Sequence, residues 1–329
     1  MSSPADRSIV VENLTRCYGD LCAVDSVDLQ IDSGRIFGFL GPNGAGKSTL
    51  VKVLTTILAP TSGRALVGGH DVVSEGHQVR SLIGVALQDV GLDPLMTASE
   101  LLQLQARLFG HTPEAARDRG RLLLERVGLD DVPAEKRVGA YSGGMKRRLD
   151  LALALVHDPA ILFLDEPTTG LDPVSRAEIW TEVRRLNRDQ GVTIFLTTQY
   201  LEEADRLADE VAIISRGHIV AQGSPEELKR EVGQEVISLV FAEDEDARQA
   251  EDVLGQLDGS RQLAGRELLV YSAKAAELVP SLVRRLDAHG LVLKGLSLAQ
   301  PSLDDVFLRA TGERMEEGDD SHLGEKVEP

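Results

Sequence analysis

One glycine-rich stretch constrains this chain more than any other: residues 41–49 read Gly-Pro-Asn-Gly-Ala-Gly-Lys-Ser-Thr. They fit the phosphate-cradling pattern G-x-x-x-x-G-K-[ST]. A short apolar run at residues 35–40 precedes them and is typical of a buried strand, and residues 50–58 follow with apolar side chains at helical spacing. Strand, glycine loop and helix form the context that this pattern requires, so we favour a phosphate site over an ordinary glycine-rich turn.

Each residue type in this phosphate loop has a role in binding phosphate. The glycines let the backbone bring successive N–H groups close to phosphate oxygens, and the helix N-terminus adds partial positive charge. Lys47 would reach the β- and γ-phosphates, and the Ser48 hydroxyl would coordinate Mg²⁺. The expected nucleotide-binding residues of the loop are Gly41, Pro42, Asn43, Gly44, Ala45, Gly46, Lys47, Ser48 and Thr49.

The composition is that of a globular chain long enough for two domains. It has 329 residues, of which 42% are hydrophobic and 27% are charged, and domains usually contain about 100 to 200 residues. A net charge of -18 argues against a nucleic-acid surface, because such a surface needs clustered Lys and Arg.

No apolar run approaches the roughly 18 residues of a membrane span, and the N-terminus lacks the apolar core of a signal peptide. We therefore expect a protein that stays inside the cell and does not itself cross a membrane.

The two cysteines, Cys17 and Cys22, have neither metal-ligand nor redox-motif spacing. We expect them to be free thiols in a reducing compartment. None of the seven histidines forms an H-x-x-x-H pair or joins a cysteine cluster, so the sequence does not predict a zinc site.

Two segments before the phosphate loop, residues 8–15 and 23–31, alternate apolar and polar side chains, as half-buried antiparallel strands do. Tyr18 lies on the turn between them, where its ring either stacks on a nucleotide base or is a surface tyrosine. Residues 81–87 are strand-like and end at Gln88, an amide that either terminates the strand or lies beside the metal of the phosphate loop.

A helical block follows at residues 97–109 and 113–127, with a polar N-cap at Thr97 or Ser99. The leucines that fall on one face of its first helix are Leu101, Leu104 and Leu108, with Leu102 and Phe109 alongside. We expect this block to pack on its own leucine stripes. It is also the natural candidate for a partner-contacting subdomain, because it interrupts an α/β pattern.

A second anion-binding geometry occurs at the signature turn, Ser142-Gly143-Gly144, which opens an apolar helix running to about His157. One phosphate group cannot easily be held by the N-termini of two helices in the same subunit. The alternative interpretation is a capped Ser-Gly-Gly turn without a ligand.

Two carboxylates, Asp165 and Glu166, follow an apolar run at residues 161–164, as at the end of a strand buried on both faces. Asp165 is suited to hold Mg²⁺, and Glu166 is suited to polarise an attacking water as a general base. Another buried strand, residues 191–196, is followed by Gln199, whose amide could donate to a γ-phosphate oxygen.

Together these motifs resemble the nucleotide-binding subunit of an ATP-binding-cassette (ABC) transporter over about residues 6–225. The resemblance implies a P-loop NTPase cassette, an α/β fold with an antiparallel β subdomain and a helical subdomain at about residues 89–157. It implies ATP and Mg²⁺ as ligands. Catalytic roles would fall to Glu166, Lys47 and Gln199, and the metal would be held by Ser48, Gln88 and Asp165. Further nucleotide contacts would come from Tyr18, Gln88, Ser142, Gly143, Gly144 and Asp172, the last within Gly170-Leu171-Asp172.

The resemblance also implies a head-to-tail dimer, in which the signature turn of one subunit closes over ATP bound at Lys47 of the other. Two positions depart from the family pattern. Met145 stands where Gln is usual and cannot make an amide hydrogen bond. Gln199 stands where His is usual, and Gln donates a hydrogen bond but cannot take up a proton. With Glu166 present, we still expect hydrolysis.

Beyond this nucleotide-binding domain of residues 1–225, we expect a small α/β accessory domain at residues 226–312. Three strand-like segments, 235–241, 267–271 and 291–298, are separated by helices, one of them at residues 275–289.

The chain's finer assignment comes from residues 301–307 and 198–203, which are similar to the daunorubicin-resistance-type branch of ABC-2-type drug exporters. The last stretch, residues 313–329, carries seven acidic residues against Arg314 and Lys326, and we expect a disordered tail.

The resulting hypothesis is an ATP-hydrolysing motor subunit. Mg-ATP would close a homodimer, and separate integral-membrane permease subunits would export a hydrophobic drug-like or antibiotic molecule. The chain would work peripherally, on the cytoplasmic face of the cell membrane, and without a nucleic-acid partner. One alternative is a soluble ABC-type ATPase acting on ribosomes or nucleic acid, although the chain lacks tandem cassettes and long heptad runs. Another, suggested by Gln199, is an ATP-gated regulator that does not hydrolyse ATP.

Overall fold

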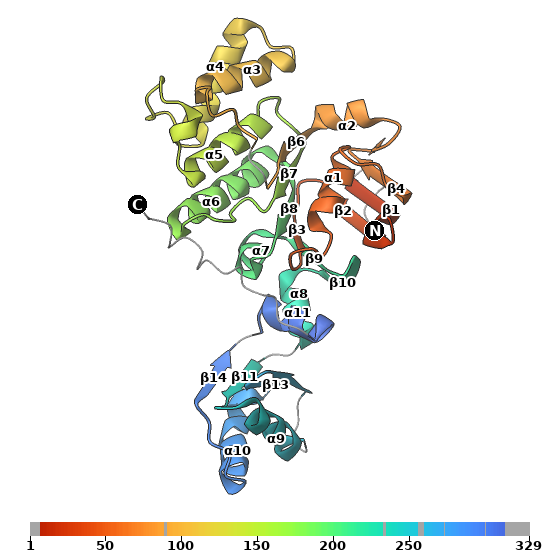
Figure 1. The fold of residues 1–329 in the computed structure, drawn as a ribbon, viewed down its shortest axis with the longest axis vertical. Helices are drawn as coiled ribbons and strands as arrows, with labels where there is room; N and C mark the ends of the chain where they lie inside the picture. The colour runs from red at the N-terminus through yellow and green to blue at the C-terminus, as the bar shows by residue number, and fades with distance from the viewer. Residues whose placement is uncertain are drawn as a thin grey trace, which may run out of the picture. The chain divides into compact units, whose positions relative to one another are not determined.

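The computed structural model describes residues 7–88, 91–232, 235–255, 260–272, 274–299 and 301–312. The predicted disordered tail, residues 313–329, lies outside these ranges. The chain divides into two compact units, with the boundary between Ile219 and Val220. Most of their elements are labelled in Figure 1.

The first unit is built on a six-stranded sheet with the strand order β10-β9-β3-β8-β7-β6. Its strands are β3 (Ile36–Leu40), β6 (Ile83–Ala86), β7 (Ile161–Asp165), β8 (Thr193–Thr198), β9 (Glu210–Ser215) and β10 (His218–Gly223). β3 pairs in parallel with β8 and β9, and β7 pairs in parallel with β6 and β8. Every residue of β3, β7 and β8 is buried, which explains their continuous apolar runs. The parallel arrangement brings the carboxyl ends of these strands to one edge of the sheet.

A second, antiparallel sheet has the order β2-β1-β4-β5. Its strands are β1 (Arg7–Tyr18), β2 (Leu21–Asp32), β4 (Ser62–Val67) and β5 (His70–Asp71). The alternation of apolar and polar residues predicted the antiparallel pair β1–β2 correctly, since Leu14 and Val27 face each other and are buried.

The expectation of two free thiols is wrong, because Cys17 and Cys22 form a disulfide. The two cysteines face each other in the register of the β1–β2 hairpin, and Tyr18 faces Leu21 at its tip. Spacing alone suggested no known cysteine motif. A tight turn between the two strands nevertheless makes residues five apart direct cross-strand neighbours.

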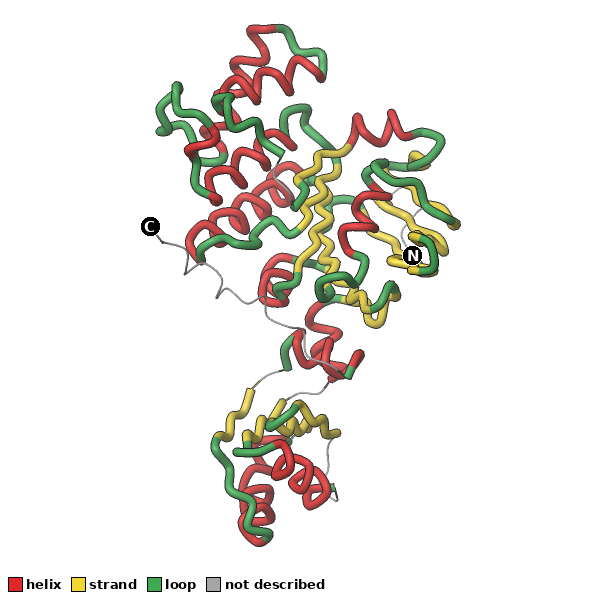
Figure 2. Tube along the Cα trace, in the orientation of Figure 1, coloured by secondary structure: helices red, strands yellow, loops and turns green. Residues whose placement is uncertain are grey.

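Helices cover both faces of the six-stranded sheet (Figures 1 and 2). The helices of this unit are α1 (Lys47–Leu54), α2 (Gly76–Leu82), α3 (Ala98–Leu108), α4 (Pro113–Arg126), α5 (Gly143–Ala154), α6 (Pro173–Gln190) and α7 (Leu201–Leu207). One core, on the side of α1 and the antiparallel sheet, includes Phe37, Phe39 and Phe195. The other, on the side of α3 to α6, includes Leu149 and Ile179. Buried aromatic and aliphatic side chains on both faces therefore fix the sheet between two layers.

The prediction that α3 packs on its leucine stripes is confirmed for Leu102, which is buried, but it is wrong for Leu104 and Leu108. Leu104 is 50% exposed and Leu108 is 74% exposed, whereas the buried row is Ala98, Leu102 and Ala106. Small residues on both sides of Leu102 let α4 approach closely, since an added Cβ on Gly120 of α4 would lie 3.4 Å from the Cβ of Leu102. The N-cap prediction at Thr97 is confirmed, because its side chain accepts a hydrogen bond from the Glu100 N–H in a capping box.

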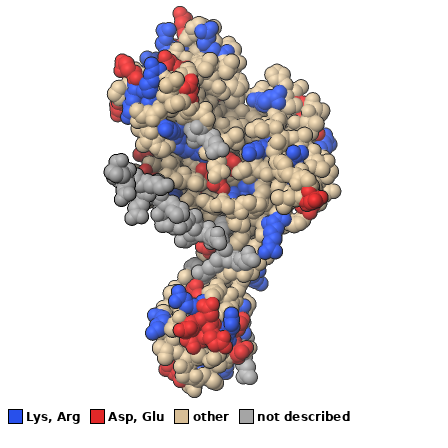
Figure 3. Space-filling view, in the orientation of Figure 1, with Lys and Arg blue, Asp and Glu red and all other residues tan. Residues whose placement is uncertain are grey.

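The second unit contains a four-stranded antiparallel sheet with the order β12-β13-β11-β14. Its elements are α8 (Pro225–Val232), β11 (Glu235–Val240), α9 (Asp244–Leu254), β12 (Ser260–Ala264), β13 (Glu267–Ser272), α10 (Ala275–Ala288), β14 (Gly295–Ala299) and α11 (Leu303–Thr311). The sequence predicted three of the strands and missed β12, whose residues are only partly buried or exposed. Its core joins the sheet to α9 and α10 through residues such as Leu239, Ala250 and Leu282. Figure 3 shows Asp and Glu side chains gathered on one face of this unit.

In the described parts of the chain, no helix combines the length and the apolar character that crossing a membrane requires.

Candidate nucleotide-binding site

The phosphate loop connects the buried strand β3 to α1, and its backbone is packed too closely for larger residues. Gly46 has a φ of +111°, and a Cβ there would lie 2.0 Å from the carbonyl oxygen of Ala23 in β2. A Cβ on Gly41 would lie 2.5 Å from the carbonyl oxygen of Ile214 in β9. These positions therefore require glycine, for conformation at Gly46 and for space at both.

The N-terminus of α1 leaves backbone donors available. No side chain caps the helix, and its first backbone hydrogen bond of helical type runs from the Leu50 N–H to the Gly46 oxygen, at 3.0 Å. The N–H groups of Lys47, Ser48 and Thr49 precede that bond, as at any helix N-terminus. Together with the helix dipole they suit an anionic phosphate.

Lys47 is buried and makes contacts within the loop and across to Glu166. Its Nζ donates to the carbonyl oxygens of Gly41 and Pro42 at 2.7 Å and 3.1 Å. It also lies 3.2 Å from Oε1 of Glu166, with both side chains 4% exposed. The cation predicted to reach phosphates and the carboxylate predicted to act as a base are therefore direct partners.

Glu166 is held in an unusual conformation by several neighbours. Its φ is +50°, a left-handed value that residues other than glycine rarely adopt. Its N–H donates to the carbonyl oxygen and to Oγ1 of Thr197, at 3.1 Å and 3.0 Å. Its Oε2 accepts from Gln88 Nε2 and from Thr169 Oγ1, both at 3.3 Å. Surrounding hydrogen bonds thus fix both the backbone and the carboxylate.

Asp165 places an oxygen beside the predicted metal ligand of the loop. Its side chain is buried, and its Oδ1 accepts hydrogen bonds from Ser48 Oγ at 3.2 Å and from Thr197 Oγ1 at 2.5 Å. Mg²⁺ is usually held by one or two protein oxygens together with substrate phosphates and water. The Ser48–Asp165 pair fits that requirement.

Three side chains important to this geometry were not predicted from the sequence: Thr197, Arg147 and Glu203. Thr197 could have been found from its place near the end of a buried strand, two residues before the predicted switch position. Arg147 gave no signal, because its partners are mainly backbone carbonyls far away in sequence.

Glu203 of α7 is fully buried beneath the site. Its Oε1 accepts hydrogen bonds from Thr168 Oγ1 at 3.0 Å and from Trp180 Nε1 at 2.8 Å. Burial raises the pKa of the Glu203 carboxyl above its ordinary value, against the hydrogen bonds that lower it. This side chain ties the turn that follows Glu166 to α6 and α7.

Asp150 of α5 lies 3.5 Å from the Arg147 guanidinium and is also poorly exposed. Burial raises the pKa of Asp150 to about 6, although the positive charge of Arg147 lowers it. Burial likewise lowers the pKa of Arg147, opposed by the nearby carboxylates of Asp150 and Asp165.

Tyr18 and Gln199 are predicted site residues that the structure does not join to this cluster. Tyr18 is 46% exposed, and the guanidinium carbon of Arg16 lies 4.7 Å from the centre of its ring. Gln199 is half-buried and takes no part in the hydrogen bonds described above.

The signature turn begins α5, which lies on the opposite side of the six-stranded sheet from α1 (Figure 1). Ser142 caps α5 by accepting a hydrogen bond from the Met145 N–H at 3.2 Å. Asp172 caps α6 in the same way, accepting from the N–H groups of Val174 and Ser175. A Cβ on Gly144 would lie 2.7 Å from Ser175 Oγ, so the starts of the two helices are close neighbours. Within one chain, the signature turn and the phosphate loop thus belong to separate sides of the unit.

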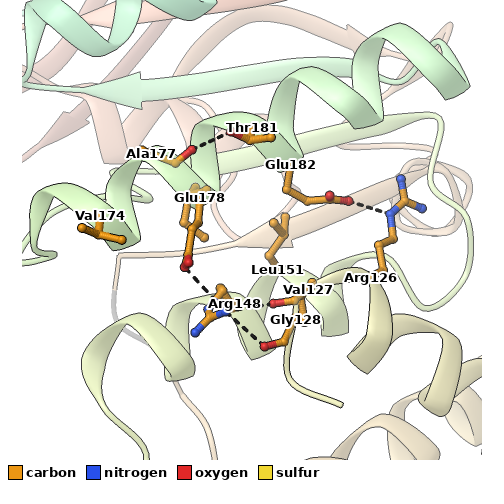
Figure 4. A pocket seen from close by; sticks show the side chains of 11 residues that line it. Arg126, Val127, Gly128, Arg148, Leu151, Val174, Ala177, Glu178, Thr181 and Glu182 are labelled. Atoms are coloured by element: carbon orange, nitrogen blue, oxygen red, sulfur yellow. Dashed lines mark hydrogen bonds and ion pairs between the residues drawn. The ribbon is translucent and has the colours of Figure 1, made fainter. Parts of the chain in front are cut away.

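A cavity of about 430 Å³ lies between the end of α4, α5 and α6 (Figure 4). Its floor includes Leu151, and its charged groups pair with one another. Arg126 lies 2.6 Å from Glu182, and Arg148 lies 3.6 Å from Glu178. None of its lining residues belongs to the predicted nucleotide site.

Comparisons with protein families match both units. Residues 24–169 match the model of the ABC transporter family, and residues 223–311 match the C-terminal domain of DrrA1-3-like ATP-binding proteins.

Curated relatives match almost the whole chain. The daunorubicin resistance ATP-binding protein DrrA3 of Streptomyces coeruleorubidus is 44% identical over 94% of this chain and 97% of its own length. The daunorubicin/doxorubicin resistance ATP-binding protein DrrA of Streptomyces peucetius is 41% identical over 95% of this chain and 94% of its own. The Nod factor export ATP-binding protein I of Ralstonia nicotianae is 40% identical over 93% of this chain and 94% of its own.

Solved structures match the cassette. A dimeric post-hydrolysis state of an ATP-binding cassette, bound to ADP and Pi, has a TM-score of 0.61 and 26% identity over 66% of this chain and 98% of its own. A subunit from a Clostridium perfringens ABC transporter complex has a TM-score of 0.63 and 29% identity over 76% of this chain and 97% of its own. The chain is therefore an ATPase and belongs to the ATP-binding subunits of ABC transporters, in their daunorubicin-resistance-type branch.

Proposed function

We propose that two copies of this chain close around Mg-ATP and that hydrolysis drives export through separate membrane subunits. The observation that carries the catalytic part is the buried Lys47–Glu166 contact, next to the Ser48–Asp165 pair. It supports the proposal because the residues proposed to bind phosphate, to hold the metal and to act as the general base lie in one cluster. The chain would work on the cytoplasmic face of the membrane, as a peripheral subunit.

Lys47 has two competing anionic partners in this proposal. In this structure it contacts Glu166 and the Gly41 and Pro42 carbonyls. The β- and γ-phosphates of ATP would attract it more strongly than a single carboxylate, because they carry more charge. Nucleotide binding would then release Glu166 from Lys47 and leave its carboxylate free to accept a proton.

Hydrolysis follows from the freed carboxylate. Glu166 accepts a proton from water as the water oxygen attacks the γ-phosphorus, and the bond to the bridging oxygen breaks to give ADP and inorganic phosphate. Lys47 and the N–H groups of the loop stabilise the charge that develops. Gln199 donates to a γ-phosphate oxygen, and Tyr18 stacks on the adenine.

Ser48 and Asp165 would hold Mg²⁺, with Gln88 close by through its bond to Glu166. When bound, the ion would neutralise phosphate charge and fix the orientation of the phosphates. Thr197 keeps the Asp165 carboxylate facing Ser48 by donating to its Oδ1.

The separation of the phosphate loop and the signature turn within one chain supports the proposed dimer. Ser142, Gly143 and Gly144 would complete the site of the second copy, and Asp172 would support them from the start of α6. Residues 1–225 would form the motor domain and residues 226–312 an accessory domain. The cargo would be hydrophobic and drug-like, in keeping with the relatives named for daunorubicin resistance.

The test of the catalytic assignment is Glu166→Gln, which keeps the shape of the side chain and removes the base. We expect ATP to bind within a few-fold of wild type while phosphate release falls by about 10² to 10⁴. The ATP-bound variant should elute as a dimer in size-exclusion chromatography. Glu202→Gln is the control, because Glu202 is 62% exposed on α7, where it forms an ion pair with Arg206. Full turnover by Glu166→Gln would contradict the assignment.

The partner assignment needs a separate measurement. The tagged wild-type chain should co-purify from detergent-solubilised membranes with a protein that has several apolar spans. Enrichment of ribosomes or nucleic acid in place of such a protein would favour the soluble alternative.

A further inference from the structure

The guanidinium of Arg147 donates hydrogen bonds to backbone carbonyls in two separate segments of the proposed catalytic site. Its side chain is 7% exposed, and it donates to the carbonyl oxygens of Leu87 at 2.5 Å, Asp165 at 2.7 Å and Pro167 at 2.8 Å. Hydrogen bonds from a charged donor are stronger than those between neutral groups. A planar guanidinium also fixes the directions of its bonds, which an ammonium group does not.

The carbonyls that Arg147 binds adjoin the residues assigned to catalysis. Leu87 directly precedes Gln88, and Asp165 and Pro167 lie on either side of Glu166. On its other side, the N–H of Glu166 is bound by Thr197. Thr197 and Arg147 thus bind the left-handed backbone of Glu166 from two sides. The direction in which the Glu166 side chain leaves the backbone therefore depends on both residues.

Arg147 belongs to the helix that starts at the signature turn. Ser142 precedes it by five residues, or about 7.5 Å along a helix axis. A helix transmits displacement along its axis with little loss, because its backbone hydrogen bonds keep its length fixed. Any shift of Ser142 toward a phosphate would therefore also move the guanidinium of Arg147.

We propose that Arg147 is a positioning residue that couples the two ATP sites of the dimer. ATP bound to one subunit pulls on the signature turn of the other, α5 moves, and Arg147 aligns Gln88 and Glu166 in its own chain. The inference rests on the head-to-tail dimer proposed above. It makes the catalytic geometry of each site depend on the occupancy of its neighbour.

Arg148, the next residue, provides a matched control. It carries the same charge and lies on the same helix, but its side chain lines the cavity between α4, α5 and α6 (Figure 4). There it donates to the carbonyls of Val127 and Gly128 at 3.3 Å and 3.2 Å. It also lies 3.6 Å from Glu178. Loss of Arg147 removes one charge and three carbonyl contacts, and loss of Arg148 removes one charge and two. Of the two arginines, only Arg147 binds the carbonyls that flank Glu166.

The experiment compares Arg147→Gln, Arg147→Lys and Arg148→Gln with wild type in steady-state ATP hydrolysis, ATP binding and thermal unfolding. We expect Arg147→Gln to lower kcat by roughly 10 to 100-fold, because small displacements of catalytic groups have effects of that size. The Kd for ATP should change by less than about threefold, since Arg147 does not belong to the phosphate loop. The positive cooperativity that coupled sites produce should disappear.

Arg147→Lys keeps the charge and guards against misfolding of the Gln variant. We expect it to unfold near the wild-type temperature, with kcat still reduced and cooperativity still absent, because one ammonium cannot span the three carbonyls. Arg148→Gln should retain both properties. If Arg147→Gln or Arg147→Lys retains wild-type kcat and cooperativity, or if Arg148→Gln loses them equally, the coupling role is wrong. A wild-type protein that neither dimerises with ATP nor shows cooperativity would instead contradict the dimer itself.

Discussion

Replacing Asp150 by Asn should stabilise the cassette, and the gain should grow with pH. Asp150 lies on α5 with its side chain 15% exposed, and burial raises its pKa from 3.8 to about 6. Between these values the folded state binds more protons than the unfolded state. Stability from this group is therefore greatest at low pH and is lost as pH rises toward 6.

The magnitude follows from the two pKa values. A difference of about two units corresponds to about 3 kcal/mol of unfolding free energy at neutral pH, at roughly 1.4 kcal/mol per unit. At pH 5, where the folded group is still mostly protonated, the loss is about half of that. Asn carries no charge and keeps an oxygen that can accept from Arg147. The advantage of Asp150→Asn over wild type should accordingly increase by about 1.4 kcal/mol between pH 5 and pH 7.5.

Urea unfolding at several pH values measures this difference. Trp180 is the only tryptophan of the chain and lies on α6, so its fluorescence reports the cassette rather than the second unit. Asp118→Asn is the control, because that carboxylate is 74% exposed on α4. A stability difference for Asp150→Asn that stays constant or shrinks as pH rises would refute the reasoning.

Two further predictions concern Glu203 and the hairpin disulfide. Glu203→Gln should cost less than about 1 kcal/mol of stability, because the amide oxygen can still accept from Thr168 and Trp180, whereas Glu203→Ala should cost about 2 to 5 kcal/mol by leaving two buried donors unpaired. Urea unfolding followed by Trp180 fluorescence measures the free energy of unfolding of both variants. Equal losses of stability in the two variants would mean that the hydrogen bonds from Thr168 and Trp180 do not stabilise the fold. Purified protein should have no titratable thiol until it is reduced, because Cys17 and Cys22 are the only cysteines. Reduction should destabilise the fold by no more than about 2 kcal/mol, since the closed loop is short; reactive thiols in untreated protein would count against the disulfide.

The sequence predicted the parts of the fold whose signals are local. The phosphate loop has fixed spacing, the strands that end at Leu40 and Asp165 are continuous apolar runs, and Ser142 and Thr97 are polar residues at helix starts. The contacts of Lys47 with Glu166 and of Ser48 with Asp165 bring together residues assigned from separate motifs.

The errors and omissions involve distant or ambiguous partners. Arg147 binds carbonyls 18, 20 and 60 residues away, and a backbone acceptor has no residue type by which a sequence can mark it. In α3 both a leucine row and an alanine–leucine row have helical spacing, and packing against distant helices such as α4 selects the second. The cysteine pairing depended on the exact register of a hairpin.

The left-handed backbone of Glu166 lowers the stability of the folded cassette. For a residue with a Cβ, that conformation reduces the free energy of unfolding by about 1 to 3 kcal/mol, a loss that glycine would largely avoid. A change of this residue to glycine would relieve that cost, but it would also remove the side chain that we propose as the general base. At this one position, selection for thermal resistance alone would therefore oppose the turnover that we propose for Glu166.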